Sequence, residues 1–200
     1  MEGSMGENVK PVNRFKVWAS QLRDSDRGAY AAVFQDMSAQ LVRYAKTITR
    51  DEASACDVIQ DVFLKLWEIR ERIKPESSLH ALLYTMTRNA AINMNRKRAP
   101  MVYQQADGED VFDQALAGKS TASDAVLEAN RLAARLHAWI DELPERRREA
   151  FVLSRHHDLS HKEISNIMGL SERTVNTHIF LALKHLRSRL DALQNDNITL

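Results

Sequence analysis

The stretch LSHKEISNIMGLSERTVNTHIFLALKHLRSRL, residues 159–190, predicts the structure of the carboxy-terminal part of the chain. Ser160 is followed three residues later by Glu163, which is the capping-box pattern that opens a helix. Gly169 can adopt the left-handed conformation that ends this helix, and Ser171 can cap a second, longer one. A short helix, a turn with glycine and a longer helix together predict a helix-turn-helix.

The longer helix is predicted to be amphipathic. Its inner side is predicted from apolar residues at three- and four-residue intervals, namely Val175, Ile179, Leu183 and Leu186, with the small Ala182 among them. The start of such a helix enters the major groove of DNA, where arginine pairs with guanine and asparagine with adenine. The candidate DNA-reading residues are Ser171, Glu172, Arg173, Thr174, Asn176, Thr177, His178 and Lys184. An ordinary helical hairpin with a solvated polar face is the alternative.

Apolar residues upstream also recur at helical spacing, and no convincing strand alternation appears. Residues 28–50 predict one helix, with apolar positions Tyr30, Val33, Phe34, Met37, Leu41, Tyr44, Ala45 and Ile48. Residues 53–70 predict a second, with the single apolar stripe Val58, Ile59, Val62, Phe63, Leu66 and Trp67. Pro75 ends this segment, and Ser77 is predicted to cap a third helix that runs to about Arg98. The inner side of the third helix is predicted to hold Leu79, Leu82, Leu83, Met86 and Ala90.

The helical periodicity lapses between Pro100 and Asp124, in a stretch with glycines and many acidic residues. It resumes at Ala125, and Pro144 is expected to start a further helix, because the missing N–H of proline costs little there. The predicted fold is therefore all-α, with two small helical domains joined by a flexible acidic linker. The predicted divisions are an amino-terminal extension (1–24), a first domain (25–99), the linker (100–124), a helix-turn-helix domain (125–193) and a tail (194–200).

Composition narrows the classes of function. The 200-residue chain has a formal net charge of only +1, but its basic residues gather on either side of the acidic stretch. This distribution suits a DNA-binding protein with a solvated linker. No apolar run approaches the ~20 residues of a membrane span and no signal-peptide core is present, so a cytoplasmic protein without membrane insertion is expected. The single cysteine, Cys56, excludes an internal disulfide and is expected to be a small packed residue.

No motif for catalysis is recognisable. The sequence contains no glycine-rich phosphate loop, catalytic triad or metal-ligand cluster, so no enzyme activity, catalytic residue, metal or cofactor is expected. His156, His157 and His161 have no cysteine or carboxylate set nearby, and solvated or DNA-proximal histidines are expected in place of a zinc site. The tryptophans occur at helical spacing with aliphatic residues and are predicted to be core residues: Trp18, Trp67 and Trp139.

Two segments resemble a known family. Residues 143–190 resemble the carboxy-terminal domain of extracytoplasmic-function sigma factors of the sigma-70 family, which reads the −35 promoter element. The helix-turn-helix also resembles the DNA-binding domain of LuxR-type response regulators. The segment DVIQDVFLKLW, residues 57–67, distinguishes sigma factors from LuxR-type regulators. It is similar to the most recognisable sigma-factor segment, and the signal-receiver domain of a response regulator has no reason to contain it.

The resemblance implies that the chain binds core RNA polymerase and promoter DNA. The helix with DVIQDVFLKLW would bind the clamp helices of the largest polymerase subunit, and the flap of the second-largest subunit is a further implied contact. The implied polymerase-binding residues are Asp57, Gln60, Asp61, Leu64, Lys65 and Glu68. The next loop and helix would hold the melted −10 strand through Lys74, Ser77, Ser78, His80, Tyr84, Arg88, Asn89, Asn93, Arg96 and Lys97. A membrane anti-sigma factor is a candidate partner, and no cofactor is implied.

Two other classes of function remain open at this point. One is a LuxR-like helix-turn-helix regulator that does not act as a sigma subunit and whose amino-terminal domain senses a signal or dimerises. The other is an enzyme acting on nucleic acid, for which the sequence offers no carboxylate or metal constellation.

Overall fold

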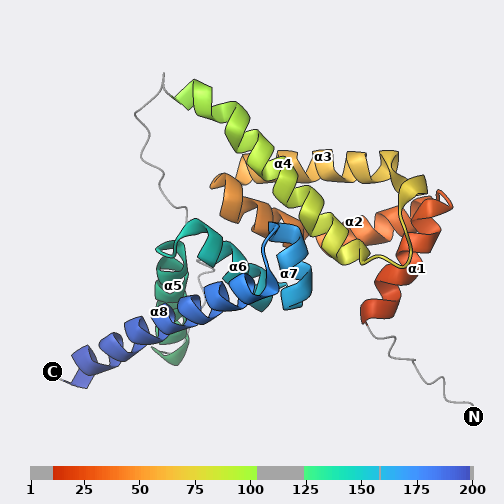
Figure 1. Cartoon of the computed structure of the whole chain (residues 1–200). Helices are drawn as coiled ribbons and strands as arrows, with labels where there is room; N and C mark the ends of the chain where they lie inside the picture. Colours follow the sequence, from red (N-terminus) through yellow and green to blue (C-terminus); the bar gives the residue numbers. More distant parts are fainter. Residues whose placement is uncertain (1–10, 103–123, 158, 199–200) are drawn as a thin grey trace, which may run out of the picture. The chain divides into compact units, whose positions relative to one another are not determined.

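The computed structural model of the chain describes residues 11–102, 124–157 and 159–198 (Figure 1). All regular elements in these ranges are helical, as predicted. In chain order they are α1 (Pro11–Arg23), α2 (Arg27–Thr49), α3 (Glu52–Glu68), the short 3-10 helix η1 (Arg70–Arg72), α4 (Leu79–Val102), α5 (Asp124–Asp141), α6 (Glu145–His156), α7 (His161–Met168) and α8 (Glu172–Ile198). None of these helices is both long and apolar enough to cross a membrane, within the part of the chain that is described.

The helices belong to two compact units. One comprises the chain up to Arg98 together with Lys162–Gly169, and the other comprises Ala99–His161 and the chain from Leu170 onward. Lys162–Gly169, the stretch that contains most of α7, therefore groups with the first unit although it follows the predicted linker in sequence. Most of that predicted linker, residues 103–123, lies outside the described residues.

The first unit is built on the packed pair α2 and α3. α2 begins after Asp26, whose carboxylate accepts hydrogen bonds from the backbone N–H groups of Gly28 (2.7 Å) and Ala29 (3.2 Å). It ends at Thr49, and the next residue, Arg50, adopts a left-handed conformation with φ 63° that lets the chain reverse into α3. The predicted stripe of α3 is confirmed, because all its members are buried except the half-buried Trp67.

α2 buries most of its predicted apolar side as well, but Phe34 is 44% exposed and its placement on the inner side is wrong. The ring of Phe34 meets the ring of Phe63 edge-on, with 4.8 Å between the centroids. Val33 and Phe34 are adjacent and point about 100° apart on a helix, so complete burial of Val33 leaves Phe34 at the rim of the contact.

α1 occupies part of the predicted amino-terminal extension and packs on α2. Arg14 joins the two helices through an ion pair with Asp36 at 2.8 Å. The guanidinium of Arg14 also lies 4.7 Å from the ring centroid of Trp18. Ala19 and Leu22 are fully buried, so α1 is an integral part of the first unit.

The start of α4 is capped by Ser78, one residue later than predicted. The Ser78 hydroxyl accepts a hydrogen bond from the backbone N–H of Ala81 at 3.1 Å, and the helix begins at Leu79. Leu79 and Leu83 of the predicted inner side are buried. The other three predicted inner residues are half-buried: Leu82, Met86 and Ala90.

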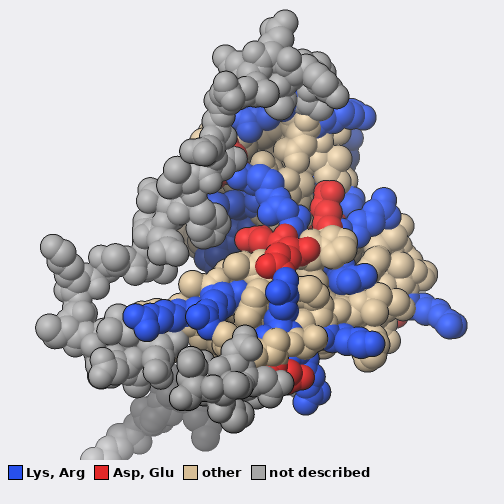
Figure 2. Space-filling view, turned by 90° about the vertical axis from the view of Figure 1, so that its left-hand side faces the viewer, with Lys and Arg blue, Asp and Glu red and all other residues tan. Residues whose placement is uncertain are grey.

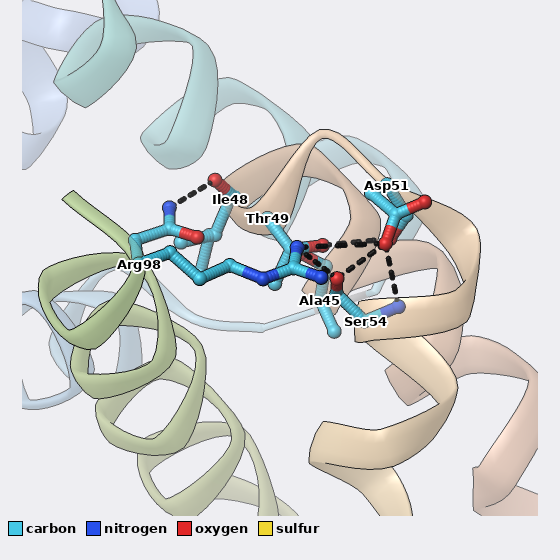
Figure 3. A network of polar contacts seen from close by, with 7 residues as sticks. Ala45, Ile48, Thr49, Asp51, Ser54 and Arg98 are labelled. Carbon is cyan, nitrogen blue, oxygen red and sulfur yellow. Dashed lines mark hydrogen bonds and ion pairs between the residues drawn. The ribbon is translucent and has the colours of Figure 1, made fainter. Parts of the chain in front are cut away.

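A polar network joins the end of α4 to the turn between α2 and α3 (Figure 3). The Asp51 carboxylate caps α3 by accepting a hydrogen bond from the Ser54 backbone N–H at 2.8 Å. The Ser54 hydroxyl donates to Asp51 and accepts from the guanidinium of Arg98, which lies 3.6 Å from the Asp51 carboxylate. Nearby, the Asn95 side chain donates to the backbone carbonyl of Ile48 at 2.8 Å. The network therefore fixes the last turns of α4 against the α2–α3 turn.

We expect Asp51→Ala to lower the free energy of unfolding by about 1 kcal/mol at pH 7, because α3 loses its cap. The Ser54 side-chain and backbone hydrogen bonds, with the charge of Arg98, hold the pKa of Asp51 below its ordinary 3.8. Because this pKa is lower in the folded chain than in the unfolded chain, the ionised carboxylate stabilises the fold at pH values above the unfolded-state pKa. This contribution is lost as the pH falls through the folded-state pKa. Urea unfolding between pH 7 and pH 3 should therefore show the gap between wild type and variant closing. Asp51→Asn, which can still cap, is the control, and a gap that does not change with pH would contradict the assignment.

The second unit is held by a small core between α5, α6 and α8. This core consists of Ile140, Leu143, Phe151, Val152, Ala182 and Leu186. The half-buried Trp139 packs against it. Pro144 precedes α6 and its carbonyl accepts hydrogen bonds from the backbone N–H groups of Arg147 (2.8 Å) and Arg148 (2.9 Å), so the predicted helix start is confirmed.

Arg148 is only 4% exposed, and its guanidinium donates hydrogen bonds to the backbone carbonyls of Asp141 (2.8 Å) and Leu143 (3.5 Å). Arg148 thereby closes the α5–α6 turn.

Both helices of the predicted helix-turn-helix are formed, because α7 is followed by a short turn and then by α8. Gly169 has φ +64°, the left-handed conformation expected of the residue that ends α7. The hydroxyl of Ser171 accepts from the backbone N–H of Thr174 at 3.1 Å and caps α8. Val175, Ile179, Ala182 and Leu186 are buried as predicted. Leu183 is 39% exposed, so its placement on the inner side is wrong.

Candidate functional site

The outer face of α3 is polar except at one residue. The predicted polymerase-binding residues are all exposed and lie opposite the buried stripe: Asp57, Gln60, Asp61, Leu64, Lys65 and Glu68. Leu64 is 64% exposed, although its neighbours Phe63 and Leu66 are buried. Lys65 and Glu68 pair across one turn at 2.8 Å. An isolated leucine surrounded by charges on a helix that already has a core is a candidate anchor for a partner protein.

The loop before α4 and the outer side of α4 form the second candidate surface. Most of the residues predicted to contact a melted strand are exposed there: Lys74, Ser77, Ser78, Asn89, Asn93, Arg96 and Lys97. His80 and Arg88 are half-buried. The exposed side chains bring amide groups and cations onto one helix, which suits contacts to unpaired bases and phosphates.

Tyr84 does not belong to this surface, because it is fully buried. Its ring packs against Tyr44 of α2, with 5.3 Å between centroids, and against His80 at 5.0 Å. An aromatic ring with a polar tip can occupy either the surface or the core, and here the apolar body of the ring is buried. The prediction that Tyr84 contacts DNA is corrected by this burial.

His80 is held between α1 and the core. The ring of Phe15, from α1, lies 4.8 Å from the His80 ring on a tilted plane, and the ring of Tyr84 also contacts His80. Phe15 in turn meets Trp18 edge-on at 5.5 Å. α1 therefore supports the first turn of α4 through aromatic contacts, a role that the predicted extension did not include.

The exposed face of α8 is the third candidate surface. Most of the predicted DNA-reading residues are exposed: Ser171, Glu172, Arg173, Asn176, Thr177 and Lys184. The other two, Thr174 and His178, are half-buried. The hydroxyls of Ser171 and Thr174 lie 2.8 Å apart, and Thr177 donates to the carbonyl of Arg173 at 2.9 Å. The exposed charged or amide side chains on this face are Glu172, Arg173, Asn176 and Lys184.

The imidazole of His178 is expected to be neutral at pH 7. Burial lowers its pKa below 6.5, and the positive charges of Arg147 and Arg146 lower it further.

Lys and Arg side chains are more widespread than Asp and Glu on the face of the protein in Figure 2. Basic surface of this kind attracts nucleic-acid phosphates.

Two expectations about single residues are wrong. Cys56 is exposed and not packed. His157 is 3% exposed and therefore not solvated, whereas His161 is exposed. No group of three or more metal-ligating side chains occurs among the described residues.

Comparisons with known proteins agree with this arrangement. Residues 33–100, which span α2 to α4, match the family model for Sigma-70 region 2, and residues 133–186 match the model for Sigma-70, region 4. The chain is 27% identical over 166 residues to the ECF RNA polymerase sigma factor SigM of Bacillus subtilis, covering 83% of this chain and 95% of SigM. It is 29% identical over 165 residues to SigL of Mycobacterium tuberculosis, covering 81% of this chain and 89% of SigL.

Solved structures show the same fold. CnrH, solved in complex with the cytosolic domain of CnrY, matches with a TM-score of 0.62 and 22% identity over 90% of this chain and 98% of that one. RpoE of Bartonella quintana, solved with the anti-sigma factor NepR, matches with a TM-score of 0.63 and 21% identity over 81% of this chain and 96% of that one. The two family matches lie in one chain, in the order expected from the sequence, and the named relatives align over most of their length. The chain therefore belongs to the extracytoplasmic-function group of the sigma-70 family of transcription initiation factors.

Proposed function

We propose that the chain binds core RNA polymerase and directs it to specific promoters, reading the −35 element as duplex and the −10 element as a melted strand. The observation that carries this proposal is the presence of both family regions in one chain, 33–100 and 133–186. A LuxR-like regulator would account for α7 and α8 but not for the match over α2 to α4.

Each of the three surfaces has its own role in this proposal. The outer face of α3 binds the clamp helices of the largest polymerase subunit, with Leu64 as the apolar anchor. The loop before α4 and its exposed side receive the separated −10 strand. The exposed start of α8 enters the major groove at the −35 element, and the second unit also contacts the flap of the second-largest subunit.

An anti-sigma factor is part of the proposal. CnrH and the Bartonella RpoE were both solved with protein partners, the latter with the anti-sigma factor NepR. We propose that a protein of this type inhibits the chain by covering surfaces that polymerase needs.

The direct test is transcription in vitro. The chain is added to core polymerase with genomic DNA fragments, and the 5′ ends of the transcripts are sequenced. Start sites that share an upstream motif and depend on the chain are expected. Transcription that is unchanged by the chain, together with duplex binding by the chain alone, would favour the regulator.

Loss of one base contact on α8 should relax promoter preference at one position. Arg173 and Asn176 lie in the first turns of α8 and are exposed, so their side chains can reach base edges in intact duplex. Arg173→Ala or Asn176→Ala should each cost ~1–3 kcal/mol of affinity for the selected −35 duplex. Binding to a library of single-base variants should show which position loses its preference, and a uniform loss over all positions would indicate a phosphate contact.

A different defect is expected on α4. Asn89 is exposed on the helix proposed to receive separated bases, so Asn89→Ala should leave −35 duplex affinity nearly intact and impair melting. Permanganate footprinting of the polymerase complex measures the melted thymines. Weakened duplex binding with normal melting would show that Asn89 does not hold the −10 strand.

A further inference from the structure

The loop between η1 and α4, residues 73–78, carries residues that are proposed to receive the −10 strand, namely Lys74, Ser77 and Ser78. Their side chains are exposed, whereas Ile73 at the start of the loop is only 5% exposed. An exposed loop binds bases in a defined geometry only if the elements at its two ends hold it in place. The contacts at these two ends therefore determine the shape in which the loop meets DNA.

The end that precedes the loop is held by Arg70, the first residue of η1. Its Nε donates a hydrogen bond to the Ser25 hydroxyl at 2.9 Å, and a second guanidinium nitrogen donates to the backbone carbonyl of Trp67 at 2.8 Å. The guanidinium also lies over the Trp67 ring, 4.5 Å from its centroid. Ser25 belongs to the turn between α1 and α2, so Arg70 joins that turn to the start of the loop.

The backbone of Ser25 shows what its side chain adds. Its φ is 62°, in the left-handed region that glycine adopts without steric cost and serine does not. Its backbone N–H donates to the carbonyl of Leu22 at 2.9 Å and closes the end of α1. Glycine would close the same turn with less strain. What serine adds to the turn is the hydroxyl that Arg70 binds.

The end that follows the loop is held by α1 itself. Phe15 of α1 lies against His80 in the first turn of α4, with 4.8 Å between the ring centroids. Arg14 fixes this part of α1 through its ion pair with Asp36 of α2 at 2.8 Å. α1 also contacts η1, and Figure 1 shows α1 beside the segment that connects α3 to α4. Both ends of the loop are thus supported by α1 and the turn that follows it.

We propose that α1 and its turn into α2 position the loop for −10 recognition, with Ser25 acting through Arg70 and Phe15 acting through His80. This inference rests on the proposed binding of the melted strand by the loop and α4. Ser25 and Phe15 are positioning residues, and neither needs to touch DNA. A loop that is held at one end alone adopts other shapes for part of the time, and its apparent affinity for the strand falls by the fraction lost.

Ser25→Gly is the main test, because it removes the hydroxyl and keeps the left-handed turn. The probe is a single-stranded oligonucleotide with the −10 sequence of promoters selected by the wild type, bound to core polymerase that carries the full chain. Loss of one hydrogen bond of this kind should lower the affinity for this oligonucleotide by roughly threefold to tenfold. The variant should also discriminate less between the four bases at the −10 positions that the loop contacts. Its affinities for core polymerase and for the −35 duplex should stay those of the wild type.

The melting temperature of Ser25→Gly should stay close to that of the wild type. Relief of the backbone strain offsets the greater freedom of glycine in the unfolded chain, so a loss of strand affinity cannot come from unfolding. Ser25→Asn should bind the strand like the wild type. Asparagine tolerates the left-handed region, and its side-chain carbonyl can accept the hydrogen bond from Arg70.

Combined variants test whether each residue acts through its stated partner. In an Arg70→Ala background, Ser25→Gly should cause no further loss of strand affinity, because both changes break the same hydrogen bond. Phe15→Leu keeps an apolar side chain on α1 but removes the ring contact with His80. It should also weaken strand binding, and its effect should add to that of Ser25→Gly because the two act at opposite ends of the loop.

Arg50→Gly is the matched control, because Arg50 has a similar left-handed φ of 63° but lies in the turn between α2 and α3. It should keep the base preference of the wild type at every −10 position. Unchanged strand affinity and base preference in Ser25→Gly would overturn the inference. An equal loss of affinity for core polymerase would show that Arg70 supports the α3 face in place of the loop, and would also overturn it. In both cases the wild type still binds the oligonucleotide, and the proposed function stands. Absence of sequence-specific strand binding by the wild type would overturn the proposed −10 reading, and this inference with it.

Discussion

Replacing Leu64 by aspartate should remove most of the affinity of this sigma factor for core RNA polymerase, at a cost of ~3–5 kcal/mol. The replacement removes the apolar anchor of the outer α3 face and buries an unpaired carboxylate in the proposed interface. Asp57 and Asp61 lie on the same face, so the new charge also has like-charged neighbours. Leu64→Ala removes only the side chain and should cost ~1–3 kcal/mol. The measurement is a titration of labelled sigma factor with core enzyme.

Folding should be unaffected by either change, because Leu64 is 64% exposed. Val17→Asp is a suitable control, since Val17 is an exposed aliphatic residue of α1 at 47% exposure. It should retain full affinity for the core enzyme. Unaltered binding by Leu64→Asp would show that polymerase uses another surface of the first unit.

Tyr84→Ala should lower the free energy of unfolding by ~3–5 kcal/mol, which is the usual cost of removing a large buried aromatic ring. Tyr84 is fully buried between Tyr44 and His80, so the cavity would separate α4 from α2 and loosen the first turn of α4. Urea unfolding of the full chain, followed by circular dichroism, measures the loss. Tyr84→Phe keeps the ring and should retain most of the stability and normal promoter melting.

The two Tyr84 variants separate a core role from a DNA-binding one. If Tyr84→Ala folds as stably as the wild type but fails to hold the melted strand, the ring acts at the surface and the burial described above is wrong. A stable Tyr84→Phe variant with impaired melting would point to the hydroxyl group as a DNA contact.

The contrast between Leu64 and Tyr84 shows how far spacing alone can predict this protein. On α3 the apolar residues follow helical periodicity without interruption, so both the buried stripe and the exposed Leu64 could be predicted. On α4 the inner side also carries polar residues, such as the buried Thr87 and the half-buried His80, and Tyr84 has both an apolar ring and a polar group. Its location depends on which rings of α1 and α2 lie nearby, and that information is absent from the local sequence.

α1 illustrates the opposite case, because its apolar spacing is visible in the sequence although residues 1–24 were predicted to be an extension outside the first domain. Phe15, Trp18, Ala19 and Leu22 recur at intervals of three and four residues, the spacing of an amphipathic helix. In the structure Ala19 and Leu22 are fully buried. The contact between Phe15 and His80 could not have been predicted in the same way, since it joins residues far apart in the sequence.

The buried position of Arg148 has a consequence for the ionic-strength dependence of promoter binding. Each phosphate that a cation neutralises releases about 0.9 condensed counterions from duplex DNA, and the logarithm of affinity falls with the logarithm of salt concentration in proportion. The run Arg146–Arg147–Arg148 looks like three such cations. The guanidinium of Arg148 is occupied by the carbonyls of Asp141 and Leu143, so it neutralises no phosphate. At most two arginines of this run therefore contribute to the slope of the logarithm of affinity against the logarithm of salt concentration. Arg148→Lys would change the melting temperature of the protein and leave that slope unchanged.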